Sequence, residues 1–185
     1  MGKNAESQAL REQGAKIDQK FILEGKFIQV RRDVIEFNGH PTQTWDLIVH
    51  PGAVAVIPID DQGRLVLVEQ WRRAIGKITI EIPAGLLEKG EAPEFCAQRE
   101  LREETGYRAK ELASFGGCYC APGLSDEYVH LFIAQGLQKD PLIADDTEAI
   151  DVRTVSPEEA LKMIEEGIIY DAKTVVGILR YARVL

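Results

Sequence analysis

Four charged side chains near the middle of the chain have the types and spacing of a group that does chemistry. Arg99 and Glu100 are adjacent, and Glu103 and Glu104 follow one helical turn later. Residues at i, i+3 and i+4 share one face of an α-helix, so the three glutamates would form a single acidic stripe. Because like charges at this spacing destabilise an isolated helix, the stripe needs another explanation.

A bound divalent cation would explain why three glutamates lie on one helix face. Mg²⁺ and Mn²⁺ prefer carboxylate oxygens and commonly bind the phosphate oxygens of a substrate as well. Arg99 lies four residues before Glu103 and is placed to hold that carboxylate in orientation. A solvated acidic helix face is the alternative, and the three glutamates alone do not exclude it.

A longer pattern favours the metal site. The chain fits G-x5-E-x7-R-E-U-x-E-E-x-G-U, where U is apolar, at Gly85, Glu91, Arg99, Glu100, Glu103, Glu104 and Gly106. At about 7% usage for each residue type, seven fixed positions coincide by chance about once in 10⁸ windows. This stretch resembles the signature of the Nudix hydrolases, with Tyr107 where an aliphatic residue is usual.

The resemblance implies a fold and a metal site. The expected fold is α/β, the Nudix α/β/α sandwich, with an added N-terminal β-hairpin. The expected cofactor is Mg²⁺, for which Mn²⁺ can substitute. Glu103 and Arg99 are predicted to be catalytic, and the predicted metal ligands are Glu100, Glu103, Glu104 and the backbone carbonyl of Ala84.

Two more positions are similar to the ADP-ribose pyrophosphatase branch of the family. The stretch EQWRR resembles a segment whose arginine binds the substrate phosphates, and a forked guanidinium suits a diphosphate. Since Trp71 replaces the usual tyrosine, the role is carried over to Arg72 and not to Arg73. Glu81 is similar to a glutamate found near the substrate. An arginine pair at a strand end is otherwise simply solvated.

A proline after the motif points to the same branch. Pro122 stands 16 residues after Gly106, and a proline at about this distance marks ADP-ribose pyrophosphatases. Glu127, with Ser125, matches the S-x-E that often follows it. The resemblance makes Pro122 and Glu127 substrate-binding residues. Without the motif, Pro122-Gly123 would be an ordinary type II turn.

The catalytic base is expected in the acidic loop that precedes the strand at 150–155. In the enzymes that this chain resembles, a glutamate of this loop moves toward the metals and assists as the base. Glu148 matches it best by its distance from the strand, and Asp145 and Asp146 remain rivals. A solvated loop is the alternative.

Apolar runs and turn residues predict the elements that position these side chains. Buried strands are expected at 52–59 and 64–71, and Pro93 and Gly106 suit the two ends of the motif helix. The remaining predictions are strands near 111–120, 128–134 and 150–155, a helix to about 167 with Ser156 as its N-cap, and a last helix over 171–183.

The chain divides into three parts on this basis. Residues 1–18 are a polar N-terminal extension, 19–50 a β-hairpin region expected in a dimer interface, and 51–185 the Nudix hydrolase domain. Asn38-Gly39 is a strong hairpin signal. A hairpin alone has too little core to be stable and needs a surface to cover it.

Two aromatic residues flank this hairpin. The surroundings of Phe27 and Trp45 resemble two positions of dimeric ADP-ribose pyrophosphatases, in which aromatic side chains from both subunits enclose the base. Stacking on a ring contributes about 1–3 kcal/mol per base. The resemblance implies a homodimer in which Phe27 and Trp45 of different subunits bind the substrate. Two core aromatics are the alternative.

The composition excludes some classes of protein. The 185 residues, 45% apolar and 28% charged, describe an ordinary globular protein, and the net charge of −8 argues against a general nucleic-acid or membrane binder. Cys96, Cys118 and Cys120 are too few for a disulfide framework, so we expect reduced thiols and a cytoplasmic location.

The expected function is Mg²⁺-dependent hydrolysis of a nucleoside diphosphate sugar, ADP-ribose, to AMP and ribose 5-phosphate. GDP-mannose or ADP-glucose remains the main alternative substrate, because the motif recognises only the diphosphate group. A Nudix enzyme that removes nucleoside triphosphates fits less well with Pro122 and the hairpin. A non-catalytic Nudix domain that senses a nucleotide would be expected to have lost the motif glutamates.

Overall fold

A computed structural model describes residues 3–25, 28–37, 39–142 and 149–184. It divides into two compact units. The first contains Met1–His50 and Ala121–Glu127, and the second contains Pro51–Cys120 and Tyr128–Leu185. The segment Ala121–Glu127 therefore belongs with the N-terminal strands and not, as predicted, with the rest of residues 51–185.

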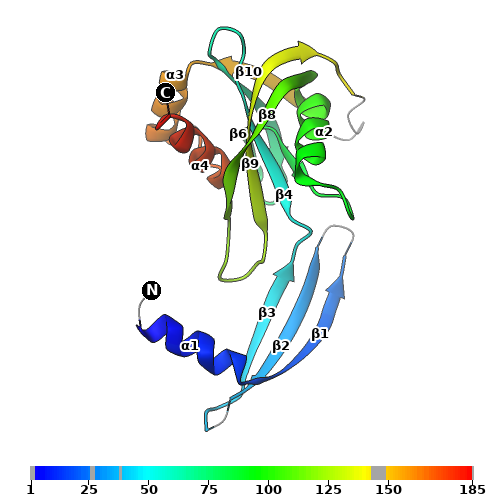
Figure 1. Ribbon diagram of the computed structural model, residues 1–185, viewed down its shortest axis with the longest axis vertical. Helices are drawn as coiled ribbons and strands as arrows, with labels where there is room; N and C mark the ends of the chain where they lie inside the picture. The colour runs from blue at the N-terminus through cyan, green and yellow to red at the C-terminus, as the bar shows by residue number, and fades with distance from the viewer. Residues whose placement is uncertain (1–2, 26–27, 38, 143–148, 185) are drawn as a thin grey trace. The chain divides into compact units, whose positions relative to one another are not determined.

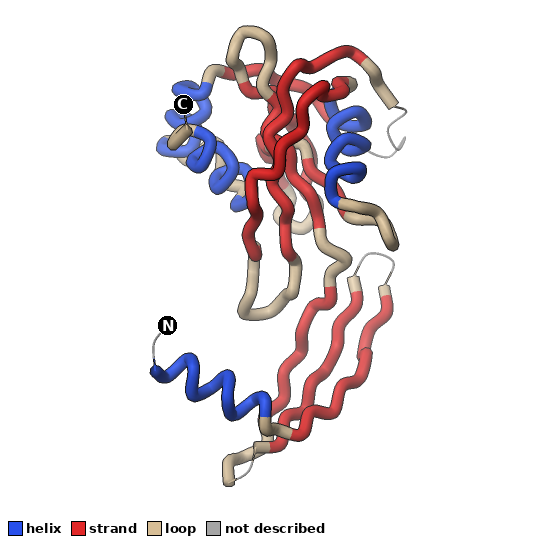
Figure 2. The backbone as a smooth tube through the Cα atoms, viewed as in Figure 1, coloured by secondary structure: helices blue, strands red, loops and turns tan. Residues whose placement is uncertain are grey.

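The first unit combines a helix with an antiparallel sheet (Figures 1 and 2). Helix α1 (Lys3–Gln13) precedes strands β1 (Lys16–Glu24), β2 (Gln29–Glu36) and β3 (Gln43–Val49), which pair in the order β1-β2-β3. Strands β2 and β3 form the expected hairpin, with Gly39 at a φ of 77° in its turn. Strand β1 adds a third strand to it.

The second unit is built on two sheets. One has the order β7-β4-β9-β8, with β4 and β9 parallel, and the other has the order β10-β5-β6. The strands are β4 (Ala53–Pro58), β5 (Leu65–Arg72), β6 (Lys77–Glu81), β7 (Ala84–Leu86), β8 (Tyr107–Tyr119), β9 (Tyr128–Lys139) and β10 (Ile150–Val155).

Helices cover both sides of these sheets. Figure 1 shows α2 (Pro93–Thr105) on one side, and α3 (Pro157–Glu165) and α4 (Ala172–Tyr181) on the other. Every residue of β4 is buried. Successive side chains of a strand point to opposite faces, so Val54 and Val56 join the core around α2, whereas Ala55 and Ile57 join the core around α3 and α4. The predicted α/β/α sandwich is confirmed.

The ends of the helices follow the predicted signals. Pro93 occupies the first turn of α2, and Gly106 ends it in the left-handed region at φ 74°. Ser156 accepts a hydrogen bond from the Glu159 N–H at 3.1 Å, as an N-cap does. Strands β6 and β7 were not predicted, because five and three residues are too short to show a period. No helix of the described ranges is long and apolar enough to cross a membrane.

We expect Leu101→Ala to lower the free energy of unfolding by about 2–5 kcal/mol, because it opens a cavity where α2 packs on β4. Leu101 is 0% exposed in that core. Phe95→Ala is the matched control on the same helix, since Phe95 is 74% exposed, and it should stay within about 0.5 kcal/mol of the unmodified protein. Urea denaturation measures both. Equal losses in the two variants would contradict this packing.

Candidate active site

Arg99 gathers three carboxylates on one side of α2. Its Nε and Nη2 donate to Glu91 at 3.0 and 2.9 Å. Its Nη1 donates to Glu100 at 2.5 Å and to Glu103 at 3.1 Å. The hydrogen bonds from Arg99 lower the pKa of Glu91 to about 2, so this carboxylate is ionised at neutral pH. The arginine thus compensates the charge that would otherwise destabilise the acidic stripe.

Gly85 is in close contact with this group. A Cβ atom on Gly85 would lie only 1.9 Å from Cδ and 2.0 Å from Oε1 of Glu100. Any side chain at position 85 would therefore displace the Glu100 carboxylate. The first glycine of the motif is required by this close approach and not by its backbone conformation, because its φ is not positive.

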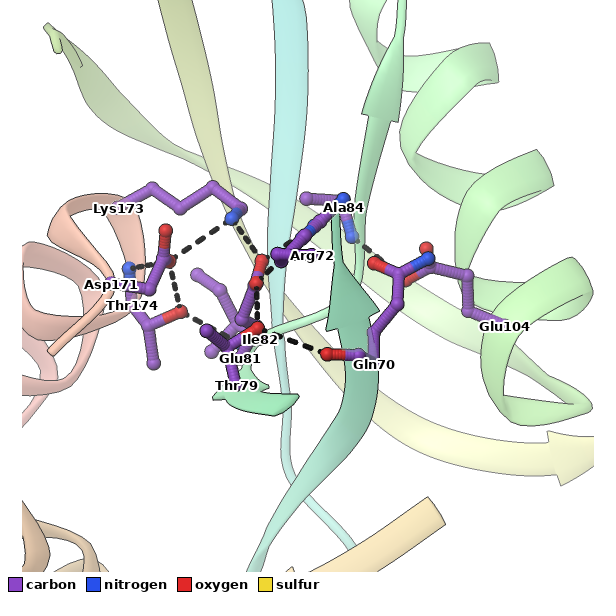
Figure 3. Close-up of polar contacts among 10 residues, drawn as sticks. All are labelled: Gln70, Arg72, Thr79, Glu81, Ile82, Ala84, Glu104, Asp171, Lys173 and Thr174. Carbon is purple, nitrogen blue, oxygen red and sulfur yellow. Dashed lines mark hydrogen bonds and ion pairs between the residues drawn. The ribbon is translucent and has the colours of Figure 1, made fainter. Parts of the chain in front are cut away.

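Glu104 connects α2 to the backbone of strand β7. It is only 8% exposed, and its Oε2 accepts a hydrogen bond from the Ala84 N–H at 2.9 Å (Figure 3). Ala84 and Gly85 are thus each held against a glutamate of the motif. The four predicted metal ligands, Ala84, Glu100, Glu103 and Glu104, lie around one short segment and one helix face.

The donor set can be compared with the needs of a metal ion. Within the described part of the chain, no group of three or more His, Cys, Asp or Glu side chains is arranged to hold one. Glu100 and Glu103 share the Nη1 of Arg99, which supplies the positive charge in this arrangement. The chemistry of the donors nevertheless fits a hard divalent cation, because carboxylate oxygens meet a backbone segment where Gly85 leaves room for them.

Arg72, at the end of β5, is held by a buried carboxylate (Figure 3). Its Nε and Nη2 donate to the two oxygens of Glu81 at 2.7 and 2.6 Å, whereas Arg73 is exposed. Burial raises the pKa of Glu81, but hydrogen bonds from Arg72 and the charge of Lys173 outweigh it, and the pKa is about 2. Glu81 therefore remains an anion that binds these two cations.

Lys173 is the residue of this group that was not predicted from the sequence. It comes from α4 and pairs with Glu81 across 92 positions of the chain. No motif spacing connects two residues that far apart. The sequence predicted only the helix that carries Lys173, over 171–183. In the structure Asp171 caps α4 and accepts a hydrogen bond from Lys173 Nζ at 3.0 Å.

Three of the predicted substrate-binding residues that the structure describes lie in the first unit. Trp45 is on β3 and is 45% exposed. Pro122 is the second residue of a turn closed by the Leu124 N–H and the Ala121 carbonyl at 3.0 Å. The type II alternative for this turn was wrong, because Gly123 does not have the positive φ that it requires.

The third is Glu127, whose Oε1 lies 3.8 Å from Nε2 of His50. Its N–H donates to the Ser125 hydroxyl at 3.2 Å. The remaining predictions fall on Phe27 and on Glu148 with its rivals Asp145 and Asp146. All four residues lie outside the described ranges.

The fold and the motif define a Nudix protein. Residues 49–174 match the NUDIX domain family, which is more than half of the chain, and the chain belongs to this family. It is a Nudix hydrolase, and such hydrolases generally use divalent metal cations.

Several known proteins are similar along most of their length. An ADP-ribose pyrophosphatase of Bacillus subtilis is 41% identical over 88% of this chain and 89% of its own. A methanol dehydrogenase activator of Bacillus methanolicus is also 41% identical, over 85% and 86%. A GDP-mannose pyrophosphatase of Yersinia pestis is 35% identical over 72% and 71%. A solved ADP compounds hydrolase shares the fold, with a TM-score of 0.82 over 91% of this chain and 92% of its own at 21% identity.

Gly85→Ala tests the close approach of Glu100. Because the new Cβ would overlap the carboxylate, we expect hydrolase activity to fall about tenfold or more if Glu100 is the metal ligand that the motif predicts, since disturbing the orientation of a ligand usually has an effect of this size. Gly14→Ala is the control, since a Cβ there meets nothing closer than 3.9 Å. Thermal unfolding separates a local effect from a loss of fold. Unchanged activity in a folded Gly85→Ala protein would contradict the arrangement.

Proposed function

We propose that the protein hydrolyses the diphosphate bond of ADP-ribose to AMP and ribose 5-phosphate. The observation that carries the choice of substrate is the 41% identity to an ADP-ribose pyrophosphatase over 88% of the chain. A second ADP-ribose pyrophosphatase, from Mycobacterium tuberculosis, is 32% identical over 88% of this chain and 80% of its own. The carboxylates around Arg99 support the chemistry.

The metal would be Mg²⁺, with Mn²⁺ able to substitute. Glu100, Glu103, Glu104 and the Ala84 carbonyl would hold it. A bound divalent ion neutralises diphosphate charge and lowers the pKa of a water molecule. Arg99 would not bind the metal itself. It orients the carboxylates through its hydrogen bonds to Glu100 and Glu103.

The other proposed roles concern the substrate and the water. Arg72 would bind the phosphates with its remaining donors while Glu81 holds the guanidinium. Pro122 and Glu127 would contact the substrate. Glu148 would take the proton of the attacking water as the general base.

We further propose a homodimer in which Phe27 of one subunit and Trp45 of the other enclose the base. The burial of the first unit supports a partner. All nine residues of β1 are exposed, among them Ile17, Phe21, Ile22 and Leu23. In the described part of that unit, Ile35 is the single apolar residue that is buried. A sheet with so little core needs a surface to cover it.

The state of the cysteines and the net charge support a proposal for the cellular location and the partners. No disulfide bond involves Cys96, Cys118 or Cys120 in the described part of the chain, which suits a reducing cytoplasm. The partner is a small nucleotide sugar, and the net charge of −8 does not favour nucleic acid or a membrane surface.

A second candidate substrate is GDP-mannose. The support is the 35% identity to a GDP-mannose pyrophosphatase over 72% of the chain. The two substrates differ in base and sugar but share the diphosphate group that the motif would bind. A panel of ADP-ribose, GDP-mannose and ADP-glucose with Mg²⁺, ranked by kcat/KM, decides between them. Adding the protein to a methanol dehydrogenase assay tests the activity that the name of the 41% identical activator suggests.

Glu103→Gln should lower kcat for ADP-ribose by about 10²-fold or more, because a carboxylate ligand becomes a neutral amide. Glu94→Gln is the matched control: the same chemical change on the exposed first turn of the same helix, expected to leave kcat within about twofold. Release of AMP under saturating Mg²⁺ measures both. Wild-type turnover by Glu103→Gln would refute the metal assignment.

The shared base site predicts complementation between subunits. Phe27→Ala and Trp45→Ala proteins, each with a raised KM, are mixed, unfolded and refolded together. In a mixed dimer one site carries both changes and the other carries neither, so about half of the sites of that dimer should recover the unmodified KM. Refolding each variant alone is the control. Full activity in a protein that sediments as a monomer would rule out the shared site.

A further inference from the structure

The N-terminus of α4 reaches into the group that holds Arg72 (Figure 3). Lys173 contacts Oε2 of Glu81 and lies 3.0 Å from Oδ2 of Asp171. The Lys173 side chain is 12% exposed and that of Glu81 only 2%. Such a buried contact is screened little by water, so it affects its neighbours more strongly than a surface ion pair does.

We propose that Lys173 is a positioning residue of the diphosphate site, which acts through Glu81 to fix the guanidinium of Arg72. The inference rests on the proposed function in one respect, the binding of substrate phosphate by Arg72. Lys173 itself would touch neither the substrate nor the reacting atoms.

The hydrogen bonds leave the Glu81 carboxylate little freedom to rotate. Oε1 accepts from Arg72 Nε and from the Thr79 hydroxyl, at 2.7 and 2.5 Å. Oε2 accepts from Arg72 Nη2 at 2.6 Å and from Lys173. Because both oxygens are fixed, the two parallel hydrogen bonds to Arg72 fix the plane of its guanidinium.

This pairing determines which donors of Arg72 remain for a ligand. It uses Nε and Nη2, and within the described part of the chain no hydrogen bond involves Nη1. The Arg72 side chain is 39% exposed. It lines an open cavity of about 480 Å³ together with Lys77, Thr79, Glu81, Tyr170 and Asp171. A ligand can therefore reach Arg72 while Glu81 holds it.

Charge balance gives Lys173 a second effect. Arg72 and Lys173 carry two positive charges, and Glu81 and Asp171 carry two negative charges, so the group is neutral. Without Lys173 its net charge would be −1 beside the proposed position of a diphosphate, which repels the substrate. Removal of Lys173 therefore weakens phosphate binding through both the orientation and the charge of the site.

The same helix end also fixes the backbone that follows Glu81. The Thr174 hydroxyl accepts a hydrogen bond from the Ile82 N–H at 3.0 Å and donates to Asp171 at 2.6 Å. Asp171 in turn caps α4 by accepting from the Thr174 N–H at 3.1 Å. Lys173 thus projects from a rigid helix terminus, which makes it suited to hold another side chain in place.

Lys173→Met tests the proposal. We expect KM for ADP-ribose to rise about tenfold and kcat to change less than threefold, because the lost interaction concerns phosphate binding in the ground state and the transition state alike. The Kd of the non-hydrolysable α,β-methylene analogue of ADP-ribose, measured by calorimetry, should rise by the same factor. Lys162→Met is the control, since Lys162 is an exposed lysine that pairs with Glu166 at 3.6 Å on α3; its KM should stay within about twofold.

A double-mutant cycle distinguishes positioning from a general structural role. In an Arg72→Ala background, Lys173→Met should raise KM by a clearly smaller factor than in the unmodified protein, because the residue it positions is gone and only its effect on the charge of the site remains. A purely structural lysine would multiply its effect on that of Arg72→Ala. Multiplicative effects, or an unchanged KM and Kd in Lys173→Met, would overturn the proposal.

A loss of folding, or a failure of the proposed function, can be distinguished from a failure of the Lys173 proposal. Thermal unfolding of each variant reports the fold. If Lys173→Met does not fold, Lys173→Gln keeps an N–H donor toward Glu81 and removes the charge, and its KM should rise about threefold or more; an unchanged KM would overturn the proposal as well. Failure of the unmodified protein to bind the analogue or to hydrolyse ADP-ribose would instead refute the proposed function.

Discussion

The acidic face of α2 depends on one guanidinium. Three glutamates at i, i+3 and i+4 repel one another, and Arg99 offsets that repulsion through Glu100 and Glu103 while it is fixed by Glu91. Arg99 is itself 25% exposed, so these contacts are partly shielded from water. The carboxylates are therefore arranged before any ligand binds, and no ordering of the helix face is needed at that moment.

The stretch from Glu81, at the end of β6, to Gly85, in β7, is held from two sides. On one side α2 contributes Glu100 against Gly85 and Glu104 to the Ala84 N–H. On the other side α4 contributes Lys173 to Glu81 and Thr174 to the Ile82 N–H. The sandwich makes this possible, because its two helix layers flank the strand ends from opposite faces. A site built in this way is rigid as long as both layers stay packed.

The first unit, unlike the second, has almost no apolar core among its described residues. Its strands pair antiparallel, with one register shift between Phe21 and Leu23 of β1, and it has ion pairs such as Arg31–Asp33 at 2.7 Å, but very little apolar burial. Hydrogen bonds along strands contribute little net free energy in water unless a core excludes solvent. A sheet of this kind is suited to association, which is the basis for proposing a second subunit there.

The sequence alone determined the motif helix, its two ends and the buried strands, because apolar period, Pro93 and Gly106 are local signals. The α/β/α sandwich was predicted from the resemblance of the motif to the Nudix family. The sequence also determined the family, since fixed spacing within 22 positions is readable without a structure. Tertiary structure decided that Glu81 pairs with Arg72 and Lys173, that a Cβ at Gly85 would strike Glu100, and that residues 121–127 lie with the N-terminal strands. Contacts across 92 positions leave no period in the sequence, because they arise only when separate elements pack together.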